Sequence, residues 1–362
     1  KRSPALVHFT IKFMNKFNDH IMDEFIKKFD QIVSGVTTAV ITSHISPDDD
    51  SIGSVLALYG YMKKQYPKLD LKIIYSGKQT DRYASFANFD KIKFVNDVAD
   101  EFNSDLLIIL DGGQYSRVSR KPDVLKTKVR RSICIDHHSS PPDNFDLKYI
   151  DSEASSVSDI VYRLFLQTET DPKILECVFL GILGDTGTFQ YVDYKQIYIF
   201  DIAKKIQEIL KVELPIFKAR YELKEKKVVE ILKEYIANIQ YMHVDGWPDF
   251  TLSFLPREVF EKYKCDDGDI SDASHWYMSE FMRIIKGYSW GIVCSPKKDG
   301  RYGFSMRSLP ESVSVSSIAE RMKGGGHDRA AGGTFDPIGG NPVTHDEVMN
   351  YILDWLAKND NI

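Results

Sequence analysis

Four short apolar runs, each followed by acidic or histidine side chains, constrain this chain more than any other feature. The runs and the polar residues that follow them are Ala39–Ile41 with His44, Asp48 and Asp50, Leu106–Leu110 with Asp111, Ile133–Ile135 with Asp136, His137 and His138, and Phe179–Leu183 with Asp185. Such runs are typical of buried strands, and four ends of this kind can meet at one edge of a sheet. Open α/β folds place their ligand sites at that edge. We therefore expect these side chains to form one site.

The residue types in these clusters are those that bind divalent metal ions. Carboxylate oxygens and neutral imidazoles coordinate such ions, and two ions about 3.5–4 Å apart can contact both the attacking and the leaving oxygen of a phosphoester. A water molecule between two ions loses a proton near neutral pH and becomes the nucleophile. The clusters therefore predict a two-metal site for phosphoester hydrolysis that needs no serine or cysteine nucleophile.

Each cluster also has an ordinary structural interpretation. Asp48–Asp50 can form a turn that caps the helix after it. Asp111 and Asp185 each precede a glycine-containing segment that is common at turns. His137 and His138 are harder to explain by packing, because adjacent histidines at a strand end bury little surface and imidazole is a frequent metal ligand. The joint occurrence of the four clusters favours the metal site.

Five motifs occur in a fixed order along the chain, the last with an arginine strand just before it. They are Ser43–Ser54, Asp111, Asp136-His137-His138, Gly184–Gly187 and the glycine-rich Gly324–Gly332, with Phe304–Ser308 as the arginine strand. In these motifs the chain resembles the DHH phosphoesterases, specifically the subfamily with the type 1 DHH-associated domain. That subfamily includes nano-RNases, pAp phosphatases and cyclic-dinucleotide phosphodiesterases. The resemblance extends approximately from Thr38 to Phe335.

The resemblance implies a role for each residue of the clusters. The ligands of two divalent ions, Mn²⁺ first and Mg²⁺ or Co²⁺ as alternatives, would be His44, Asp48, Asp50, Asp111, His137 and Asp185. Asp111 would bridge the ions. Asp136 would orient a histidine, and His138 would face the scissile phosphate or have a purely structural role. Asp111, Asp136 and His138 are thus the expected catalytic residues.

The downstream motifs predict a substrate-binding element. Its expected residues are Arg307, Ser308, Gly324, Gly325, Gly326 and His327. The glycines permit positive φ and let backbone N–H groups approach an anion, although three glycines are also common in a plain flexible turn. The arginine offers two parallel donors to a phosphate or a base edge, and the histidine and serine can add hydrogen bonds to the same group.

Composition limits the class of protein. The chain has 362 residues, 43% of them hydrophobic, which is enough for two cores. Its net charge of −5 gives no basic field for long nucleic acids, whereas a short anionic substrate held by metals needs none. The four cysteines are too far apart for a CxxC motif and predict a reducing, cytoplasmic location without disulfides.

Alternating strand-like and helix-like segments predict an α/β fold. We expect a parallel-sheet catalytic domain joined by a helical connector to a smaller mixed α/β substrate-binding domain, with a substrate cleft between the domains. The expected boundaries are an N-terminal amphipathic helical segment at 1–34, the catalytic domain at 35–214, the connector at 215–238 and the DHH-associated domain at 239–362.

The N-terminal segment has apolar residues at helical spacing among charged ones. They are Met14, Phe17, Ile21, Phe25, Phe29 and Ile32. This pattern predicts a helix that covers the catalytic domain or contacts a second copy, so a homodimer is left open. No stretch approaches the ~20 apolar residues of a membrane span, and we expect no membrane partner.

The expected substrates are short RNA or DNA oligonucleotides or linear dinucleotides, cleaved to 5′-mononucleotides, and not long duplexes. A second anchor at a fixed distance from the metals would act as a ruler. Alternatives are a pAp 3′-phosphatase, a cyclic-dinucleotide phosphodiesterase and a catalytically silent nucleotide sensor. A family II pyrophosphatase shares the metal motifs, but Gly324–Gly332 and Arg307 argue against it. The aromatic segment His275–Tyr277 either stacks on a base or is simply packed.

Overall fold

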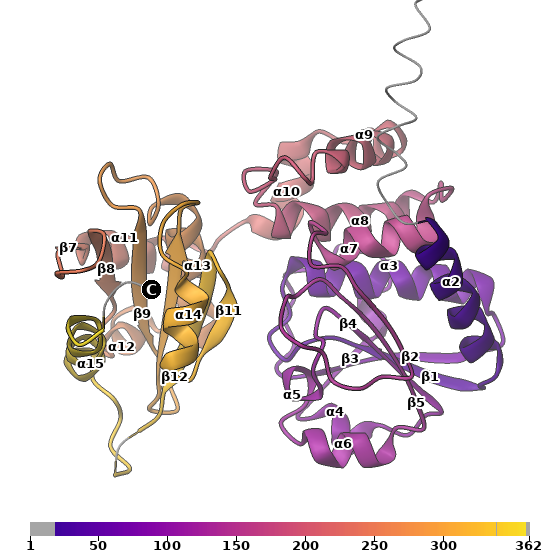
Figure 1. The fold of residues 1–362 in the computed structure, drawn as a ribbon, viewed down its shortest axis with the longest axis horizontal. Coiled ribbons are helices and arrows are strands. Elements are labelled where there is room, and N and C mark those ends of the chain that lie inside the picture. The colour runs from indigo at the N-terminus through magenta and orange to yellow at the C-terminus, as the bar shows by residue number, and fades with distance from the viewer. Residues whose placement is uncertain (1–18, 338, 360–362) are drawn as a thin grey trace, which may run out of the picture. The chain divides into compact units, whose positions relative to one another are not determined.

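The computed structural model describes residues 19–337 and 339–359, and the chain divides into two compact units after Leu223 (Figure 1). Met14 and Phe17 of the N-terminal pattern lie outside the described residues. The rest of that pattern forms helix α2, Asp19–Ser34, in which Phe25 and Phe29 are buried in the core of the first unit. The predicted amphipathic helix therefore covers the first unit.

The first unit alternates strands and helices as predicted. Its further elements are β1 (Thr38–Thr42), α3 (Asp49–Gln65), β2 (Asp70–Ser76), β3 (Ile92–Val95), α4 (Val98–Glu101), β4 (Leu106–Leu110), α5 (Tyr115–Val118), α6 (Pro122–Lys128), β5 (Arg131–Asp136), β6 (Leu147–Ile150), α7 (Val157–Val161) with a π-helical turn (Tyr162–Leu166), α8 (Pro172–Asp185), α9 (Tyr198–Leu210) and α10 (Leu214–Glu222). The strands form one parallel sheet in the order β3-β2-β1-β4-β5-β6.

Helices cover both faces of this sheet, because alternate strand residues point to opposite sides. Ile41 and Ile108 pack on the side of α3, α7 and α8, while Val40 and Leu107 pack on the side of α4, α5 and α6 (Figure 1). The strand order reverses between β1 and β4. In open α/β sheets, ligands bind beyond the carboxyl ends of the strands at such a reversal.

Two glycines let α3 and α8 cross at close range. A Cβ atom on Gly53 would lie 2.5 Å from the Cys177 carbonyl oxygen and 2.8 Å from the backbone nitrogen of Gly181. The close crossing brings the beginning of α3, which carries Asp50, against the end of α8, which carries Asp185.

The second unit contains a smaller mixed sheet. Its elements are α11 (Lys226–Ala237), β7 (Gln240–Met242), β8 (Phe250–Phe254), α12 (Val259–Tyr263), α13 (Asp267–Glu280), β9 (Trp290–Pro296), β10 (Tyr302–Ser308), α14 (Val315–Arg321), β11 (Gly325–His327), β12 (Ala330–Phe335) and α15 (His345–Ala357). The strand order is β11-β12-β10-β9-β8-β7, and only the β8–β9 pair is parallel.

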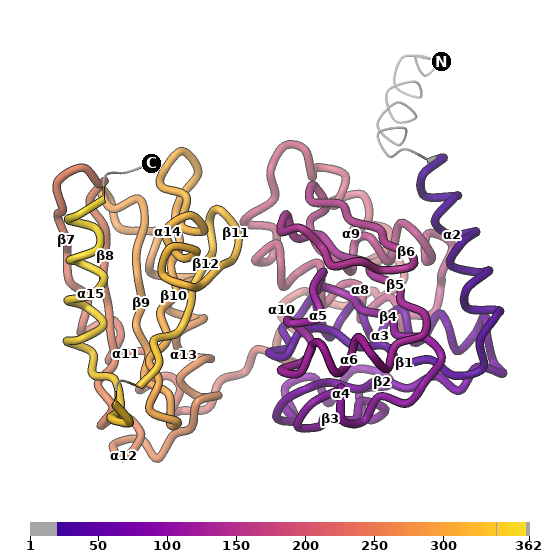
Figure 2. Tube along the Cα trace, turned by 60° about the horizontal axis from the view of Figure 1, so that its bottom comes forward, coloured from indigo at the N-terminus to yellow at the C-terminus, as the bar shows by residue number. Residues whose placement is uncertain are grey.

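The two faces of this sheet differ in how they are covered. Helices α14 and α15 pack on one face, over Ile292 and Met306 (Figure 2). Helices α11 and α13 pack on the other face at Val293. On that second face, Ser305 and Arg307 of β10 are only partly buried. The face therefore keeps an accessible area over β10, β12 and β11.

Local structure differs from the sequence-based expectation at two places. The apolar run before Asp185 is helical, since it belongs to α8, whose start is capped by the Asp171 side chain with Pro172 at its first position. Of the expected connector 215–238, α10 packs into the first unit through Phe217, and α11 packs into the second through Ile231.

All four cysteines are free and buried. Across the described residues, none of the helices combines the length and the apolar character that crossing a bilayer requires.

Candidate metal centre

Three strand ends of the first unit carry three of the six predicted metal ligands. His44 follows β1, Asp111 directly follows β4, and His137 directly follows Asp136, the last residue of β5. These strands flank the reversal of strand order. Asp185 reaches the same place from the end of helix α8. The prediction that one edge of the sheet collects the site therefore holds for the three strand-borne clusters, while Asp185 comes from a helix end.

Asp111 lies between the histidines. Its Oδ2 atom is 3.2 Å from His44 Nε2, and its Oδ1 atom is 3.7 Å from His137 Nε2. The side chain is buried, and Oδ1 has no hydrogen-bond partner among the described residues. A buried carboxylate oxygen without a partner is costly in a protein interior. Its position between two imidazoles fits a shared metal ligand.

Asp111 has a positive φ of 53°. Non-glycine residues adopt this conformation at a cost, and such strain gathers at functional sites. The backbone N–H of Asp111 donates to the carbonyl of Ile135 at 3.0 Å, which ties the turn to β5. The strained backbone thus directs the carboxylate toward the histidines of the neighbouring strand end.

Asp111 belongs to three groups of possible ligand atoms, one of which it forms with Asp136 and His138. In each group the three ligand atoms lie within 4.8 Å of one another. The other two groups are His44, Asp48 and Asp111, and Asp50, Asp111 and His137. We call the first of these two the His44 group and the second the His137 group. Asp185 adjoins the His137 group, because its Oδ2 atom is 3.3 Å from His137 Nε2.

Asp48 was predicted either to cap a helix or to face the metal site, and it does both, because it caps α3 and also faces His44. Its Oδ1 atom accepts a hydrogen bond from the Ser51 backbone N–H at 2.9 Å, while Oδ2 lies 3.5 Å from His44 Nε2. Asp50 is fully buried, and its two oxygens accept backbone N–H groups of Val157 and Ser158. Carboxylate oxygens have two acceptor positions each, so both residues keep capacity for a metal.

Electrostatics at the site favour a bound cation. Burial and, after it, the charge of Asp111 raise the pKa of Asp50 to about 7. Burial also raises the pKa of Asp185 well above its usual value, together with the charges of Asp50 and Asp48. Carboxylates that repel one another in a buried place become stable in the ionised form when a divalent ion lies between them. The donor set therefore fits divalent metal ions.

Asp136 is held by hydrogen bonds and orients His138. Its Oδ1 atom lies 2.8 Å from His138 Nδ1 and accepts the His137 backbone N–H, also at 2.8 Å, while Oδ2 accepts the Gly113 N–H at 2.7 Å. Burial would raise the pKa of Asp136, but the hydrogen bond from His138 and the charges of both histidines lower it. A Cβ atom on Gly113 would lie 2.7 Å from Asp136 Oδ2, which explains a glycine there.

The sequence did not reveal that backbone groups of the segment from 154 to 158 contact the side chains of Asp50 and His137. Besides the two N–H groups bound by Asp50, the Ala154 carbonyl lies 3.5 Å from His137 Nδ1. The one local signal is Ser156 three residues before Asp159, an N-cap pattern that the structure contains, because the Ser156 hydroxyl accepts the Asp159 N–H at 3.0 Å.

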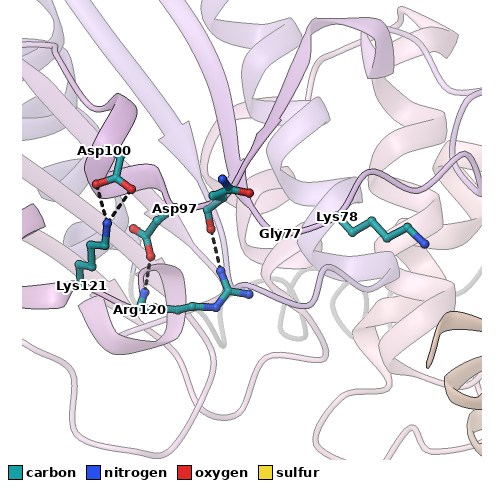
Figure 3. A pocket seen from close by; sticks show the side chains of 7 residues that line it. Gly77, Lys78, Asp97, Asp100, Arg120 and Lys121 are labelled. Carbon is teal, nitrogen blue, oxygen red and sulfur yellow. Dashed lines mark hydrogen bonds and ion pairs between the residues drawn. The ribbon is translucent and has the colours of Figure 1, made fainter. Parts of the chain in front are cut away.

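A cavity of about 540 Å³ lies elsewhere in the first unit (Figure 3). It is lined by Gly77, Lys78, Asn96, Asp97, Asp100, Arg120 and Lys121. Both Asp100 oxygens accept from Lys121, and Asp97 accepts the Arg120 backbone N–H at 2.7 Å. Its carboxylates are thus engaged with neighbouring groups, and none of the predicted site residues lines it.

The predicted substrate-binding residues of the second unit are only partly brought together. Arg307 of β10 and His327 of β11 both pair with Ala330 of β12, so the three share one row on one face of the sheet. Two strand spacings separate Arg307 from His327 by about 10 Å. Ser308 is fully buried on the opposite face, and its hydroxyl lies 3.5 Å from the Asp328 carbonyl. Ser308 therefore does not share the row of Arg307.

The glycines of this motif follow helix α14 and form a hairpin strand instead of a loop before a helix. Gly326 has a φ of 143°, and a Cβ atom there would lie 2.5 Å from the Ala330 carbonyl oxygen. A Cβ on Gly324 would clash with Gly332, whereas one on Gly325 would meet open space. Two of the three glycines are thus required by close approach of the hairpin strands.

The aromatic segment His275–Tyr277 lies in α13. Tyr277 is fully buried and stacks on Tyr235, with ring centroids 5.6 Å apart. Trp276 packs against the same cluster. For these two side chains, the packed alternative is the one observed.

Comparisons with known proteins agree with this geometry. The family model of the DHH family N-terminal domain matches residues 38–182, and that of the DHHA1 domain matches residues 267–355. The chain is 26% identical to a probable bifunctional oligoribonuclease and PAP phosphatase NrnA of Streptococcus mutans, over 88% of this chain and 96% of that protein. It is 24% identical to the bifunctional oligoribonuclease and PAP phosphatase NrnA of Bacillus subtilis, over 84% and 91%.

A solved structure has the same fold. The crystal structure of an exopolyphosphatase-related protein from Bacteroides fragilis superposes with a TM-score of 0.77 at 21% identity, over 93% of this chain and 97% of that one. With both domain models matched in order and the motif residues gathered around Asp111, the chain belongs to the DHH phosphoesterases that carry a DHHA1 domain.

Proposed function

We propose that this chain is a two-metal phosphoesterase that hydrolyses short oligonucleotides or linear dinucleotides to 5′-mononucleotides. The observation that carries the proposal is Asp111, a buried carboxylate shared by the His44 and His137 groups. The relatives named oligoribonuclease and PAP phosphatase support the substrate class. When bound, two divalent ions would neutralise the phosphate and acidify a water molecule.

Residues of the chain would bind the ions, contact the phosphate and anchor the substrate. His44, Asp48, Asp50, Asp111, His137 and Asp185 would hold the ions, with Mn²⁺ as the proposed metal. Asp136 accepts from His138 Nδ1, which leaves the Nε2 side of that ring to face a phosphate oxygen. In the second unit, Arg307 would bind a terminal phosphate or base edge, with Ala330 leaving space beside it.

Hydrolysis of the 3′-phosphate of pAp is a second candidate activity of the same site. The observation that favours it is that the names of the Streptococcus mutans, Bacillus subtilis and Thermus thermophilus relatives combine oligoribonuclease with PAP phosphatase. Cleavage of both substrates needs no second site, because each presents a phosphoester at the end of a short nucleotide. The four buried thiols fit a reducing compartment, so we propose the cytoplasm.

The test is Mn²⁺-dependent turnover of pAp, linear dinucleotides, short RNA and cyclic dinucleotides, with the products separated by chromatography. We expect 5′-mononucleotides from the dinucleotides and shortest RNAs, and AMP with phosphate from pAp. Activity confined to a cyclic dinucleotide would overturn the substrate assignment. Binding of these nucleotides by the metal-loaded protein without any turnover would support a sensor instead.

The matched control is Asp111→Asn, purified in the same way. Because it removes the carboxylate charge at nearly constant size, its turnover should fall far below that of the wild type if Asp111 belongs to the centre. Equal turnover in the two preparations would therefore contradict the proposed centre.

A further inference from the structure

A buried ion-pair network lies behind the His137 group, in the first turns after β6. Arg163 is 4% exposed and donates from Nε to Asp159 Oδ1 at 2.8 Å and from Nη2 to Asp151 Oδ2 at 2.9 Å. Tyr198 of α9 donates its hydroxyl to Asp159 Oδ2 at 2.6 Å, and its ring lies 5.5 Å from the Arg163 guanidinium carbon. Asp159 is fully buried. The network thus joins α7, α9 and the loop after β6.

This network holds both ends of the loop from 151 to 156. Asp151 opens the loop and is bound by Arg163, while Ser155 near its end donates its N–H and its hydroxyl to Asp159 Oδ2 at 3.2 and 3.3 Å. Between these anchors lies Ala154, whose backbone N–H donates to the Asp151 carbonyl at 3.0 Å. The position of the Ala154 carbonyl is therefore determined by Arg163 and Asp159.

That carbonyl faces His137 Nδ1 at 3.5 Å, the long end of the hydrogen-bond range. A carbonyl can only accept, so this contact favours the imidazole tautomer with the proton on Nδ1. The lone pair of Nε2 is then directed toward Asp111 and Asp185, which lie 3.7 and 3.3 Å away. This tautomer is the one that a metal at Nε2 requires.

The same segment also supports Asp50. The backbone N–H groups of Val157 and Ser158 donate to Asp50 Oδ2 at 2.6 Å and Oδ1 at 2.8 Å, and these residues begin the helix that contains Asp159. Asp50 and His137 therefore rest on five consecutive residues, 154–158. Across the part of the chain that the structure describes, the His44 group makes no hydrogen bond or ion pair with this segment: His44 contacts Asp48 and Asp111, and Asp48 caps α3.

The energetics argue against stability as the main use of the network. Desolvation of a buried ion pair can exceed its Coulomb attraction, so apolar side chains of similar volume often stabilise a fold equally well. The network also contains the π-helical turn Tyr162–Leu166, and such insertions in helices are frequent at functional sites. A role in orienting ligands explains both features.

We infer that Arg163, acting through Asp159 and Asp151, is a positioning residue for the metal ion of the His137 group and not for the ion of the His44 group. The inference rests on the proposed two-metal function. It requires that loss of the network weaken one of two metal sites selectively. Partners that orient metal ligands in this way typically contribute about 10–100-fold to metal affinity.

The experiment compares Mn²⁺ binding by the full chain and its variants, measured by calorimetry, with unfolding by urea as the measure of stability. Arg163→Lys keeps the charge but loses the paired donors of the guanidinium. Tyr198→Phe removes a single hydroxyl from Asp159 and gives a milder variant that should fold even where Arg163→Lys does not. In both, we expect one Mn²⁺ site to weaken by about 10-fold or more and the other to stay within about 2-fold.

The matched control is Arg220→Met. Arg220 of α10 forms a partly buried ion pair with Glu176 Oε2 at 2.7 Å in the same unit. Glu176 precedes Asp185 by nine residues in α8, so the two are separated by about 13 Å along the helix. This control should lower stability without changing either Mn²⁺ site. Excess Mn²⁺ should also restore kcat in the Arg163 and Tyr198 variants, which a general loss of structure would not allow.

Four outcomes are informative. Weakening of one site in the Arg163 or Tyr198 variant supports the inference. Equal weakening of both sites, or a loss of stability with both sites intact as in Arg220→Met, overturns it while the two-metal function stands. A wild-type chain that binds no divalent metal overturns the proposed function itself.

Discussion

His44 Nε2 lies 3.2 Å from Oδ2 of Asp111, so a side chain after β1 and a side chain after β4 meet across the point where the strand order reverses. Burial would lower the pKa of His44, but the carboxylates of Asp48 and Asp111 outweigh burial and raise it to about 10. The imidazole therefore carries a proton where a metal ion would otherwise neutralise the carboxylates. Proton and metal ion compete for the same place.

This competition predicts how metal binding depends on pH. The folded-state pKa of His44 is raised to about 10 and that of Asp50 to about 7, so both groups hold protons at or below neutral pH. A metal needs both groups deprotonated. The apparent Mn²⁺ affinity should therefore rise as pH increases toward 10, with protons released on binding. Calorimetry in buffers of different ionisation heat measures the release, and binding at neutral pH without proton release would contradict the prediction.

Asp111→Asn is expected to lower kcat by at least about 100-fold, the scale of losing one electrostatic group at a reacting centre. Asparagine tolerates the φ of 53° at this position, whereas alanine would add backbone strain. The fold should remain, as circular dichroism can verify. Turnover of a linear dinucleotide close to that of the wild type would exclude a shared role for this carboxylate.

Gly181→Ala should weaken metal binding through Asp50. A Cβ atom at this position would lie 2.6 Å from Asp50 Oδ1 and closer still to the Ser158 hydroxyl. Neither contact can be relieved without moving a side chain that the segment from 154 to 158 holds. We expect Mn²⁺ affinity to fall by about 10-fold or more, with a loss of stability of about 1–3 kcal/mol from overpacking.

Combining Gly181→Ala with Ser158→Ala tests whether this crowding causes the loss, because the second substitution removes the hydroxyl nearest to the new Cβ. The double variant Gly181→Ala/Ser158→Ala should recover part of the lost affinity and stability, because the atom that lies nearest to the new Cβ is no longer there. Strictly additive effects of the two substitutions would show that the crowding lies elsewhere.

Arg307→Ala should raise KM for a linear dinucleotide by about 10-fold or more, the value of one charge-assisted pair of hydrogen bonds. A generic chromogenic phosphodiester has no terminal phosphate or base to bind, so its cleavage should be unchanged. Arg307 shares its row with Gly291 and Ala330, and so has small neighbours on both adjacent strands. Equal losses on both substrates would contradict the anchoring role.

Ser308→Ala provides the comparison within the same strand. Because Ser308 is fully buried on the face opposite to Arg307, its loss should change KM little and act on stability instead. A KM effect as large as that of Arg307→Ala would show that the serine contacts the substrate after all.

Residue types and spacing were sufficient to predict strands β1, β4 and β5 and the meeting of His44, Asp111 and His137. Parallel strands present their carboxyl ends at one edge, and few side chains bind divalent metals, so both can be inferred locally. The helical state of the run before Asp185 could not be inferred from the run itself, because a short apolar run is consistent with both a buried strand and a buried helix. Length and the cap at Asp171 decided it.

By itself, the sequence determined the family, the donor types and the strand ends at which His44, Asp111 and His137 lie, because these depend on local pattern and metal chemistry. Only the tertiary structure decided which groups support the ligands. Asp50 and Val157 are 107 residues apart, and their hydrogen bond exists because the start of α3 packs against the start of α7. Packing between distant segments also buries Ser308 and brings the Tyr198 hydroxyl to Asp159. Such contacts are set by the whole fold, and no local pattern encodes them.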